Sequence, residues 1–225
     1  MVLAIPGYMA AEFPALFDQV YQLRHRVFVD RLGWRALARP DGRETDQFDV
    51  VTAMHLVGIE RARVVSYSRL LPTSGPHLLR DVYPELVRGA RVPDGEGVYE
   101  WTRLCTDPDR DDASAPISRP ARELFVAMAE FCVAHGIHTI IAESDPLWIT
   151  RLGQLGWHVR PLALPSMLEG KPVVPLAASA DAMTVAKSRR ILAVEREVLD
   201  TSIYDGRGPF HQPGFGQADR RLALN

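Results

Sequence analysis

The sequence predicts a single α/β domain in which helices flank a mixed β-sheet. Three observations support this fold class. The 225 residues fit one large domain or two small ones and can bury a sizeable core. Strand-like and helix-like apolar patterns follow one another along residues 1–200, and neither an internal repeat nor a linker interrupts them. We therefore expect one domain over residues 1–204 and a Gly- and Pro-rich tail, irregular or mobile, over residues 205–225.

The N-terminal half begins with a short strand over residues 2–5. Apolar residues between Phe13 and Phe28 then recur at helical spacing, which predicts a helix over residues 12–28. A polar loop containing Pro and Gly follows over residues 35–49. Beyond it we expect strands over 53–59 and 63–71, a short helix or irregular turn over 78–87, and a central strand over 97–106.

The C-terminal half begins with a polar loop over residues 107–116. A strongly periodic apolar pattern then predicts a helix over residues 121–134. The remaining expected elements are a buried strand over 138–142, a helix over 146–155, strands over 157–164 and 173–176, and an amphipathic helix over 180–199.

Composition and charge argue against several classes of protein. A net charge of −2 argues against a general nucleic-acid binder, which needs a basic excess to displace counterions. No segment approaches the roughly 18 apolar residues of a membrane span, and the N-terminus lacks the pattern of a secretory signal. The histidines show no metal-binding spacing, and Cys105 and Cys132 are expected to be buried thiols. We expect a cytoplasmic protein without a metal and without a membrane partner.

A stretch of charged and aromatic residues over 24–49 is the first candidate site. Arg24 projects from the apolar face of the predicted helix, where a guanidinium is costly unless carboxylates meet it. The nearest carboxylates in the sequence are Glu44, Asp46 and Asp49. This set is either a buried salt-bridge network that pins the loop to the helix or a site for a small zwitterion with extra positive charge. Phe28 and Trp34 are either core residues or ring faces for a cation.

Two predicted strands also carry charged residues in their interiors. Arg69 lies within the strand-like run Ser68–Thr73, and Glu100, Trp101, Thr102 and Arg103 follow one another in the central strand. Strand alternation places Glu100 with Thr102 on one face and Trp101 with Arg103 on the other. Arginines inside two strands, with carboxylates available from loop and strand, predict a polar cleft within the sheet.

The order and spacing of these motifs resemble a known family. The motifs are RxxVFxxRLGW, ExDxFD, RLLPT and ExTR, and together they resemble the acyl-homoserine-lactone synthases, the LuxI-type autoinducer synthases. The resemblance is strong over residues 20–106 and weaker to residue 164. The family's invariant positions fall on Arg24, Phe28, Trp34, Asp46, Asp49, Arg69, Glu100 and Arg103. The departures are Ser66, Tyr83 and Thr102, where the family commonly has Gly, Phe and Ser.

The resemblance implies an acyltransferase fold of the GNAT type, with a twisted mixed sheet and a cleft between splayed strands. It implies two substrates, S-adenosylmethionine and a fatty-acyl thioester, and no further cofactor. The S-adenosylmethionine site would be formed by Arg24, Phe28, Trp34, Asp46, Asp49, Arg69 and Arg103. Glu100 is the candidate base for the amine, with Arg103 and Asp46 beside it in the catalytic set.

The acyl donor has two interpretations. Residues 107–120 lack the Gly-rich loop with which GNAT enzymes hold a coenzyme A pyrophosphate, which favours an acyl carrier protein meeting the region of Arg110, Arg119 and Arg122. The motifs RPDGRETDQFD and YEWTR instead resemble a branch that uses acyl-coenzyme A, which we prefer slightly. The residues expected to line the acyl pocket, each of which could equally be plain core, are Leu124, Phe125, Met128, Ile140, Ala142 and Trp148.

Two other functions are compatible with the same residues. The chain could be a GNAT-type N-acyltransferase acting on another amine, with no need for S-adenosylmethionine. It could also be an inactive relative that binds a thioester or a partner protein without turnover. Retention of the charged and aromatic motif positions favours an active acyl-homoserine-lactone synthase over both alternatives.

Overall fold

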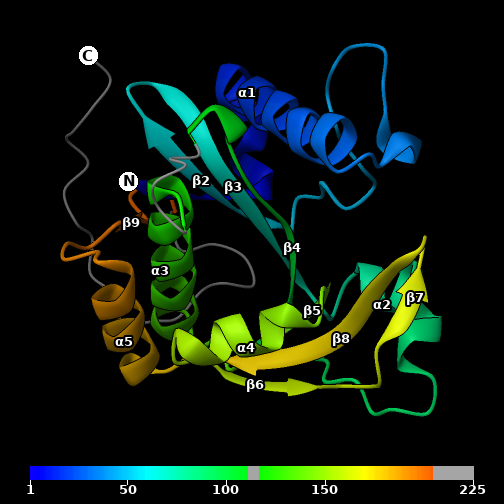
Figure 1. Ribbon diagram of the computed structural model, residues 1–225. Coiled ribbons are helices and arrows are strands. Elements are labelled where there is room, and N and C mark those ends of the chain that lie inside the picture. Colours follow the sequence, from blue (N-terminus) through cyan, green and yellow to red (C-terminus); the bar gives the residue numbers. More distant parts are fainter. Residues whose placement is uncertain (111–116, 205–225) are drawn as a thin grey trace.

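A mixed β-sheet forms the centre of the molecule in the computed structural model, which describes residues 1–110 and 117–204 (Figure 1). Among these residues the sheet has nine strands, in the order β6-β8-β5-β4-β3-β2-β1-β9, with β7 paired to β8. The strands are β1 (Val2–Pro6), β2 (Met54–Glu60), β3 (Arg63–Pro72), β4 (Val98–Thr106), β5 (Thr139–Ser144), β6 (His158–Pro161), β7 (Ser166–Leu168), β8 (Lys171–Ser179) and β9 (Leu199–Asp200). The α/β fold class is confirmed.

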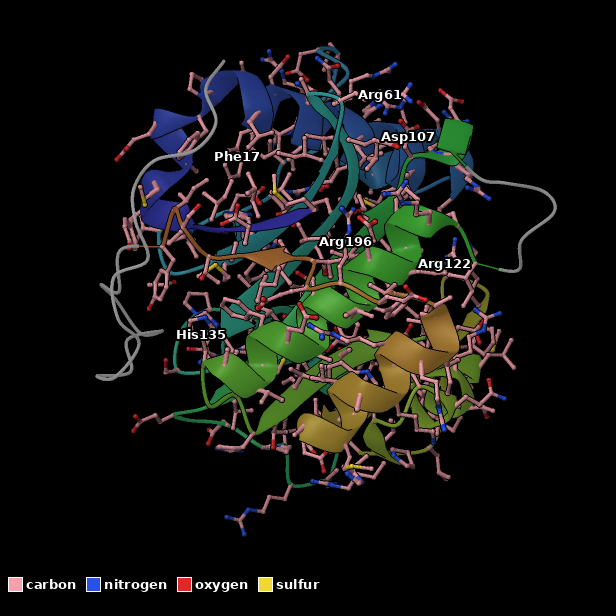
Figure 2. The ribbon with its side chains drawn as sticks, turned by 90° about the vertical axis from the view of Figure 1, so that its left-hand side faces the viewer. Phe17, Arg61, Asp107, Arg122, His135 and Arg196 are labelled. Atoms are coloured by element: carbon pink, nitrogen blue, oxygen red, sulfur yellow. The ribbon has the colours of Figure 1, made fainter. Side chains whose placement is uncertain are left out.

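Helices cover both faces of the sheet. The α-helices are α1 (Pro14–Arg24), α2 (Leu78–Asp81), α3 (Arg119–Ala134), α4 (Leu147–Gln154) and α5 (Ala182–Leu192). Helix α1 packs on β3 and β4 from one side, and α3 packs on β1 to β4 from the other. Figure 2 shows α5 beside α3, with Arg122 near the start of α3 and His135 at its end. None of the described helices is both long enough and apolar enough to span a bilayer.

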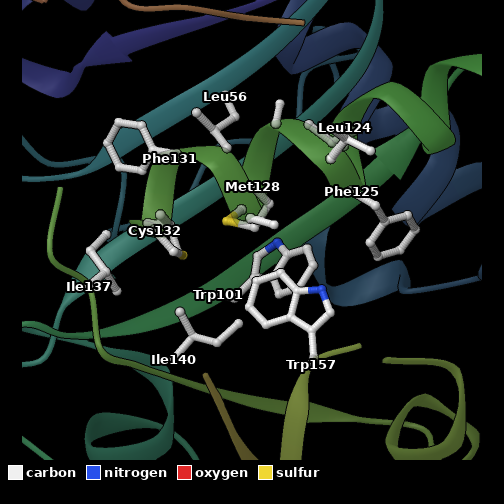
Figure 3. Close-up of a cluster of buried hydrophobic side chains, with 14 of the residues drawn as sticks. Leu56, Trp101, Leu124, Phe125, Met128, Phe131, Cys132, Ile137, Ile140 and Trp157 are labelled. Atoms are coloured by element: carbon white, nitrogen blue, oxygen red, sulfur yellow. The ribbon is translucent and has the colours of Figure 1, made fainter. Parts of the chain in front are cut away.

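The main core lies between α3 and the sheet. Helix α3 buries apolar side chains along most of its length, and these pack against Trp101 of β4, Ile140 of β5 and Trp157 before β6 (Figure 3). The rings of Trp101 and Trp157 are stacked with centroids 5.8 Å apart. A second cluster of apolar residues lies under α1 on the opposite face. The sheet therefore separates an apolar layer under α3 from the face that carries the charged motifs.

Strands β4 and β5 separate along their length. They are parallel and pair over only three residues each, Val98–Glu100 with Thr139–Ile141. Beyond this point β4 stays paired with β3, and β5 stays paired with β8. Glu100 therefore lies at the point where the two halves of the sheet diverge, as the expected splayed-strand fold requires.

A β-bulge in β4 breaks the expected alternation of side chains. The register between β3 and β4 shifts by one residue between Tyr67 and Arg69, and Arg103 adopts a left-handed backbone conformation with φ of 55°. Trp101 stays in the core under α3, whereas Arg103 reaches the carboxylates near α1. The prediction that Trp101 and Arg103 share a face is wrong, because a bulge inserts one extra residue and re-aims the next side chain.

The C-terminal elements differ from the sequence-based expectation. The helix predicted over 180–199 begins at Ala182, behind a capping box formed by Asp181 and Thr184, and it ends at Leu192. Ala193 then takes a left-handed conformation and the chain returns to the sheet as β9, beside β1. The hairpin of β7 and β8 was not predicted either, because the sequence predicted only one strand here, over residues 173–176. The expected tail over residues 205–225 lies outside the described residues.

Candidate active site

Arg24 reaches the site from the end of α1, where the helix widens into a π-helix over His25–Arg31. The N–H of Leu32 donates to the carbonyl of Val27, and the N–H of Trp34 donates to the carbonyl of Phe28. Such π-helical turns are rare and frequently occur at functional sites. The widened turn lets Arg24 and Phe28 contact the same group of charged residues although the chain leaves the helix shortly after them.

Arg24 is buried and is held by the carboxylates that the sequence placed near it. Its Nε donates to Glu44 Oε2 at 2.6 Å and its Nη1 donates to Asp49 Oδ1 at 2.6 Å. The rings of Tyr21 and Tyr67 flank the guanidinium, with centroids 5.5 and 5.6 Å from its central carbon. Among the described residues, Arg24 Nη2 has no hydrogen-bond acceptor, although Asp46 lies 3.8 Å away as an ion pair.

Arg69 crosses to the same carboxylates from the middle of β3. Its Nη1 donates to Asp46 Oδ1 at 2.7 Å and to Asp49 Oδ1 at 2.6 Å, and its Nη2 donates to Asp46 Oδ2 at 3.0 Å. Its Nε donates to the hydroxyl of Thr102 on the neighbouring strand at 3.1 Å. Every polar nitrogen of this buried guanidinium therefore has a partner, as a charge removed from water requires.

Arg103 completes the group from the bulge in β4. Its Nη2 donates to Glu44 Oε1 at 3.1 Å and lies 2.7 Å from Asp46 Oδ2. Its guanidinium also lies over the ring of Phe28, 5.5 Å from the centroid, and Phe28 stacks on Trp34 with centroids 5.0 Å apart. We call Arg24, Arg69, Arg103, Glu44, Asp46 and Asp49 the arginine–carboxylate cluster.

The cluster balances three cations with three carboxylates. Burial would raise the pKa of Asp49, but Arg24 and Arg69 more than compensate and hold it well below its usual range. The pKa of Asp46 is lowered as well, because the hydrogen bond and charge of Arg69 outweigh burial. Burial opposes the charge of Arg24 too, yet Tyr67, Asp49 and Glu44 raise its pKa well above the usual value. Asp46, Asp49 and Arg24 therefore stay charged at neutral pH.

Glu100 is buried on the cluster's face of β4, two residues before Thr102, but it makes different contacts. Its Oε2 accepts a hydrogen bond from the N–H of Leu78 at 2.7 Å, and its Oε1 accepts one from the N–H of Leu79 at 2.6 Å. The carboxyl group of Glu143 on β5 lies close enough to affect the pKa of Glu100. Burial raises the pKa of Glu100, against the effect of the two backbone amides.

The six residues expected to line an acyl pocket come together on the other side of the sheet. Leu124, Phe125 and Met128 of α3 are buried with Ile140 of β5. Two further members, Ala142 of β5 and Trp148 of α4, are partly buried against this main core. The ring of Trp148 packs on Phe125 with centroids 5.4 Å apart.

Three side chains at the site were missed or left unassigned in the sequence. Glu44 was a candidate partner of Arg24 but not a site residue, although it bonds both Arg24 and Arg103. Glu143 directly follows the strand that the sequence predicted to end at residue 142. A carboxylate immediately after such an apolar run was the signal that could have identified it as a site residue. His55, whose Nδ1 lies 2.7 Å from the hydroxyl of Tyr67 behind the cluster, had no recognisable signal.

The basic region considered for a carrier protein is only partly free. Arg119 pairs with Glu123 at 3.0 Å, and Arg122 Nη1 donates to the carbonyl of Leu192 at 3.4 Å. Arg119, Arg122 and Glu123 line a surface cavity of about 320 Å³ together with residues 193–196, which follow α5. The side chain of Arg110 lies outside the described part of the structure.

Comparison with known proteins agrees with the motifs and the fold. A family model described as autoinducer synthase matches residues 11–187. The isovaleryl-homoserine lactone synthase of Bradyrhizobium diazoefficiens is 33% identical over 169 residues, which are 75% of each chain.

Solved structures extend the likeness to the whole fold. The structure of BjaI, a CoA-dependent acyl-homoserine lactone synthase solved with SAM and isopentyl-CoA, has a TM-score of 0.81 at 28% identity and covers 89% of this chain and 92% of its own. An N-acetyltransferase structure from Lactobacillus plantarum has a TM-score of 0.50 at 18% identity, covers 79% and 95% of the two chains, and shows the GNAT-like fold alone. The chain belongs to the autoinducer synthase family and is an acyltransferase, an acyl-homoserine-lactone synthase.

Proposed function

We propose that this enzyme transfers an acyl group from acyl-coenzyme A to the amine of S-adenosylmethionine and then closes the lactone. The arginine–carboxylate cluster carries this proposal, because buried charges of both signs suit a substrate that brings an amine, a carboxylate and a sulfonium. The stacked rings of Phe28 and Trp34 border the cluster and offer an aromatic surface for the sulfonium, worth about 0.5–2 kcal/mol.

Substrate binding divides between cations and carboxylates. The buried Nη2 of Arg24 has no acceptor among the described residues, so it can donate to the substrate's carboxylate. Asp46 and Asp49 balance the substrate's positive groups, and Arg69 and Arg103 hold those two carboxylates in place. This arrangement is preorganised, because every element that supplies a charge is fixed by hydrogen bonds before substrate arrives.

Acyl transfer begins when the neutral amine attacks the thioester carbonyl. The amine loses a proton to Glu100, directly or through a water, and coenzyme A leaves as its thiol when the amide forms. The substrate's carboxylate then displaces methylthioadenosine from the γ-carbon, which closes the lactone. Glu100 is suited to the role of base, because it lies about 7 Å along the strand from Thr102 and the cluster, at the point where β4 and β5 separate.

The acyl chain is proposed to lie on the α3 side of the separated strands. The apolar residues there come from α3, α4 and β5. Of the six residues expected to line the acyl pocket, Trp148 and Ala142 are the two that are only partly buried and can still contact an acyl chain. A short or branched chain suits this surface, because aromatic rings already fill much of the core behind it.

The proposed donor is acyl-coenzyme A rather than acyl carrier protein. The similarity to the isovaleryl-homoserine lactone synthase and to the BjaI complex with isopentyl-CoA supports this choice. The basic region that a carrier protein would need is weakened by its own ion pairs. We also infer a cytoplasmic location, where both substrates are made.

A donor panel tests the proposal. Purified enzyme with S-adenosylmethionine is offered the same acyl chains, isovaleryl and straight chains of increasing length, as coenzyme A and as carrier-protein thioesters. Methylthioadenosine release and the mass of the lactone are measured. We expect a kcat/KM at least tenfold higher with coenzyme A thioesters. A preference for the carrier-protein thioester would overturn the proposed donor.

The same assay separates the remaining functions. An N-acyltransferase for another amine would acylate its substrate without releasing methylthioadenosine, and an inactive relative would release none with any donor. Replacing Glu100 with Gln tests the base. We expect kcat to fall by two to four orders of magnitude in a folded variant, the range typical of general base catalysis. Unchanged activity would remove Glu100 from that role.

A further inference from the structure

Two carboxyl groups meet where β4 and β5 separate. Glu100 pairs with Ile141 across the two parallel strands, and Glu143 follows Ile141 by two residues. Residues two apart in a strand share a face, so both carboxyl groups lie on the same side of the sheet. The two carboxyl groups lie close enough for each to affect the pKa of the other. We call Glu100 and Glu143 the carboxyl pair.

Two neighbouring carboxyl groups can form a hydrogen bond with each other only if one of them is protonated, because two ionised carboxylates have only acceptors. Glu100 already accepts from the backbone N–H groups of Leu78 and Leu79, one to each oxygen. The Oε1 atom of Glu143 is buried and has no hydrogen-bond partner among the described residues. Amide donors stabilise an anion, so the negative charge belongs on Glu100 and the proton on Glu143.

The surrounding charges agree with this assignment. Burial raises the pKa of Glu143 well above its usual range, and the charge of Glu100 raises it further. The other titratable groups on the elements around the pair include His77, Arg80, Asp81, Tyr83, Glu85, Arg103 and Glu169. Arg80 is exposed and paired with Asp81, so solvent screens its effect on the pair. Hence the proton on Glu143 is set chiefly by burial and by its partner.

We propose that Glu143 is a positioning residue for acyl transfer: it is a neutral carboxylic acid at neutral pH and holds Glu100 as the anion by donating a hydrogen bond to it. The inference rests on the proposed function, in which Glu100 accepts the proton of the substrate amine. A hydrogen bond from a neutral donor favours the ionised form of its acceptor. Without that donor, buried Glu100 takes up a proton at a higher pH and fewer enzyme molecules carry a usable base.

The test compares the pH profile of kcat/KM in three variants with the wild type. Glu143→Gln keeps a neutral donor of similar shape, so its acidic limb should stay within about half a pH unit of the wild type. Glu143→Leu removes the donor, and the acidic limb should move to higher pH by about one to two units. The control is Glu85→Leu on the nearby turn Pro84–Val87, where an exposed carboxylate is lost and the limb should not move.

Two results would overturn the inference. One is a Glu143→Leu variant with normal circular dichroism and an unshifted acidic limb. The other is a Glu143→Gln variant whose limb moves as far as that of Glu143→Leu, because Glu143 would then act through a negative charge. If Glu143→Leu does not fold, infrared spectra decide: the wild type at pH 7 should show a protonated carboxyl band that Glu143→Gln lacks. Absence of methylthioadenosine release by the wild type would instead refute the proposed function.

Discussion

At the scale of single residues, the arginine–carboxylate cluster is a costly structure. Arg24, Arg69 and Glu44 are fully buried, and taking such charges out of water costs several kcal/mol per ion before their attraction is counted. Apolar residues of the same volume would often stabilise a fold at least as well. Keeping six charged groups in this place therefore makes more sense as a binding site for a charged substrate than as a device for stability.

Glu44 is the residue whose loss should damage the cluster most clearly. Glu44→Gln leaves Arg24 and Arg103 with less compensating charge in a buried site, and we expect the free energy of unfolding to fall by about 3 kcal/mol. Asp18→Asn is the matched control, because Asp18 pairs with Arg43 between the same helix and loop but at the surface. Asp18→Asn should lower the free energy of unfolding by about 0–1 kcal/mol.

Urea unfolding of the wild type and both variants at pH 7 measures these costs. Equal losses for Glu44→Gln and Asp18→Asn would contradict the view that Glu44 is the buried counter-charge of two arginines. The accompanying loss of activity does not separate a folding defect from a binding defect, so the comparison is made on stability alone.

The cluster was largely predictable from the sequence, whereas Glu143 and the face of Arg103 were not. An arginine on an apolar helix stripe needs a carboxylate, and this requirement alone joined Arg24 to Glu44, Asp46 and Asp49. Glu143 became visible only through the register of β4 and β5, whose paired residues are 41 positions apart in the chain. The bulge that turns Arg103 arises in the pairing between β3 and β4. The alternation of residues within one strand gives no information about that pairing.

At the scale of elements, the loop over residues 35–49 divides into two parts. The second part is fixed, because the N–H of Glu44 donates to the carbonyl of Tyr21 and the carboxylates bind three arginines. The first part is mostly exposed and includes the short 3₁₀ turn Arg35–Leu37 after Trp34. Of the two parts, we expect this first part to close over a substrate that binds against Trp34.

Limited proteolysis tests that division. Trypsin should cleave after Arg35 more slowly when S-adenosylmethionine is bound. The cleavage rate should fall in proportion to the fraction of molecules whose loop is still open. Cleavage after Arg43 should be slow in both states, because Arg43 is anchored to Asp18 and precedes the buried Glu44. Arg91, exposed on a distant loop, is the control and should be cleaved at one rate. Equal cleavage after Arg35 in both states would show that this part does not close.

Element boundaries show where sequence patterns lose information. The apolar periodicity of the last helix continues past Leu192, so the sequence predicted helix to residue 199. Val194 and Val198 are indeed buried, but as part of a segment that returns to the sheet, and the N–H of Leu199 donates to Glu130 on α3. Burial alone cannot distinguish a helix from an extended segment packed on the same core.

At the scale of the whole molecule, the separation of β4 and β5 puts two different environments on the two faces of one sheet. The charged cluster and the carboxyl pair lie on the α1 side, and the apolar residues of α3 and α4 lie on the other. We propose that the polar amine substrate and the apolar chain meet where these two strands separate. This follows from the topology, which the family resemblance implied and the strand pairing confirms.

Trp148 is the residue that should set the length of the acyl chain. It lies on α4 at the margin of the core, between the ring of Phe125 and the guanidinium of Arg151. Trp148→Ala removes a large ring, and longer acyl chains can then bury methylenes in the freed space at about 0.8 kcal/mol each. We expect the kcat/KM of successively longer straight-chain acyl-coenzyme A substrates to rise about fourfold per methylene relative to the wild type, until the space is filled.

Leu147→Ala is the control for this change, because Leu147 neighbours Trp148 on α4 but is 59% exposed and should leave the chain-length profile unchanged. The measurement is methylthioadenosine release over a series of donors at a fixed concentration of S-adenosylmethionine. A uniform fall in activity with an unchanged optimum would mean that Trp148 is ordinary core. A shifted optimum in which S-adenosylmethionine keeps its KM would show that the two faces of the sheet bind their substrates independently, as the separation of β4 and β5 requires.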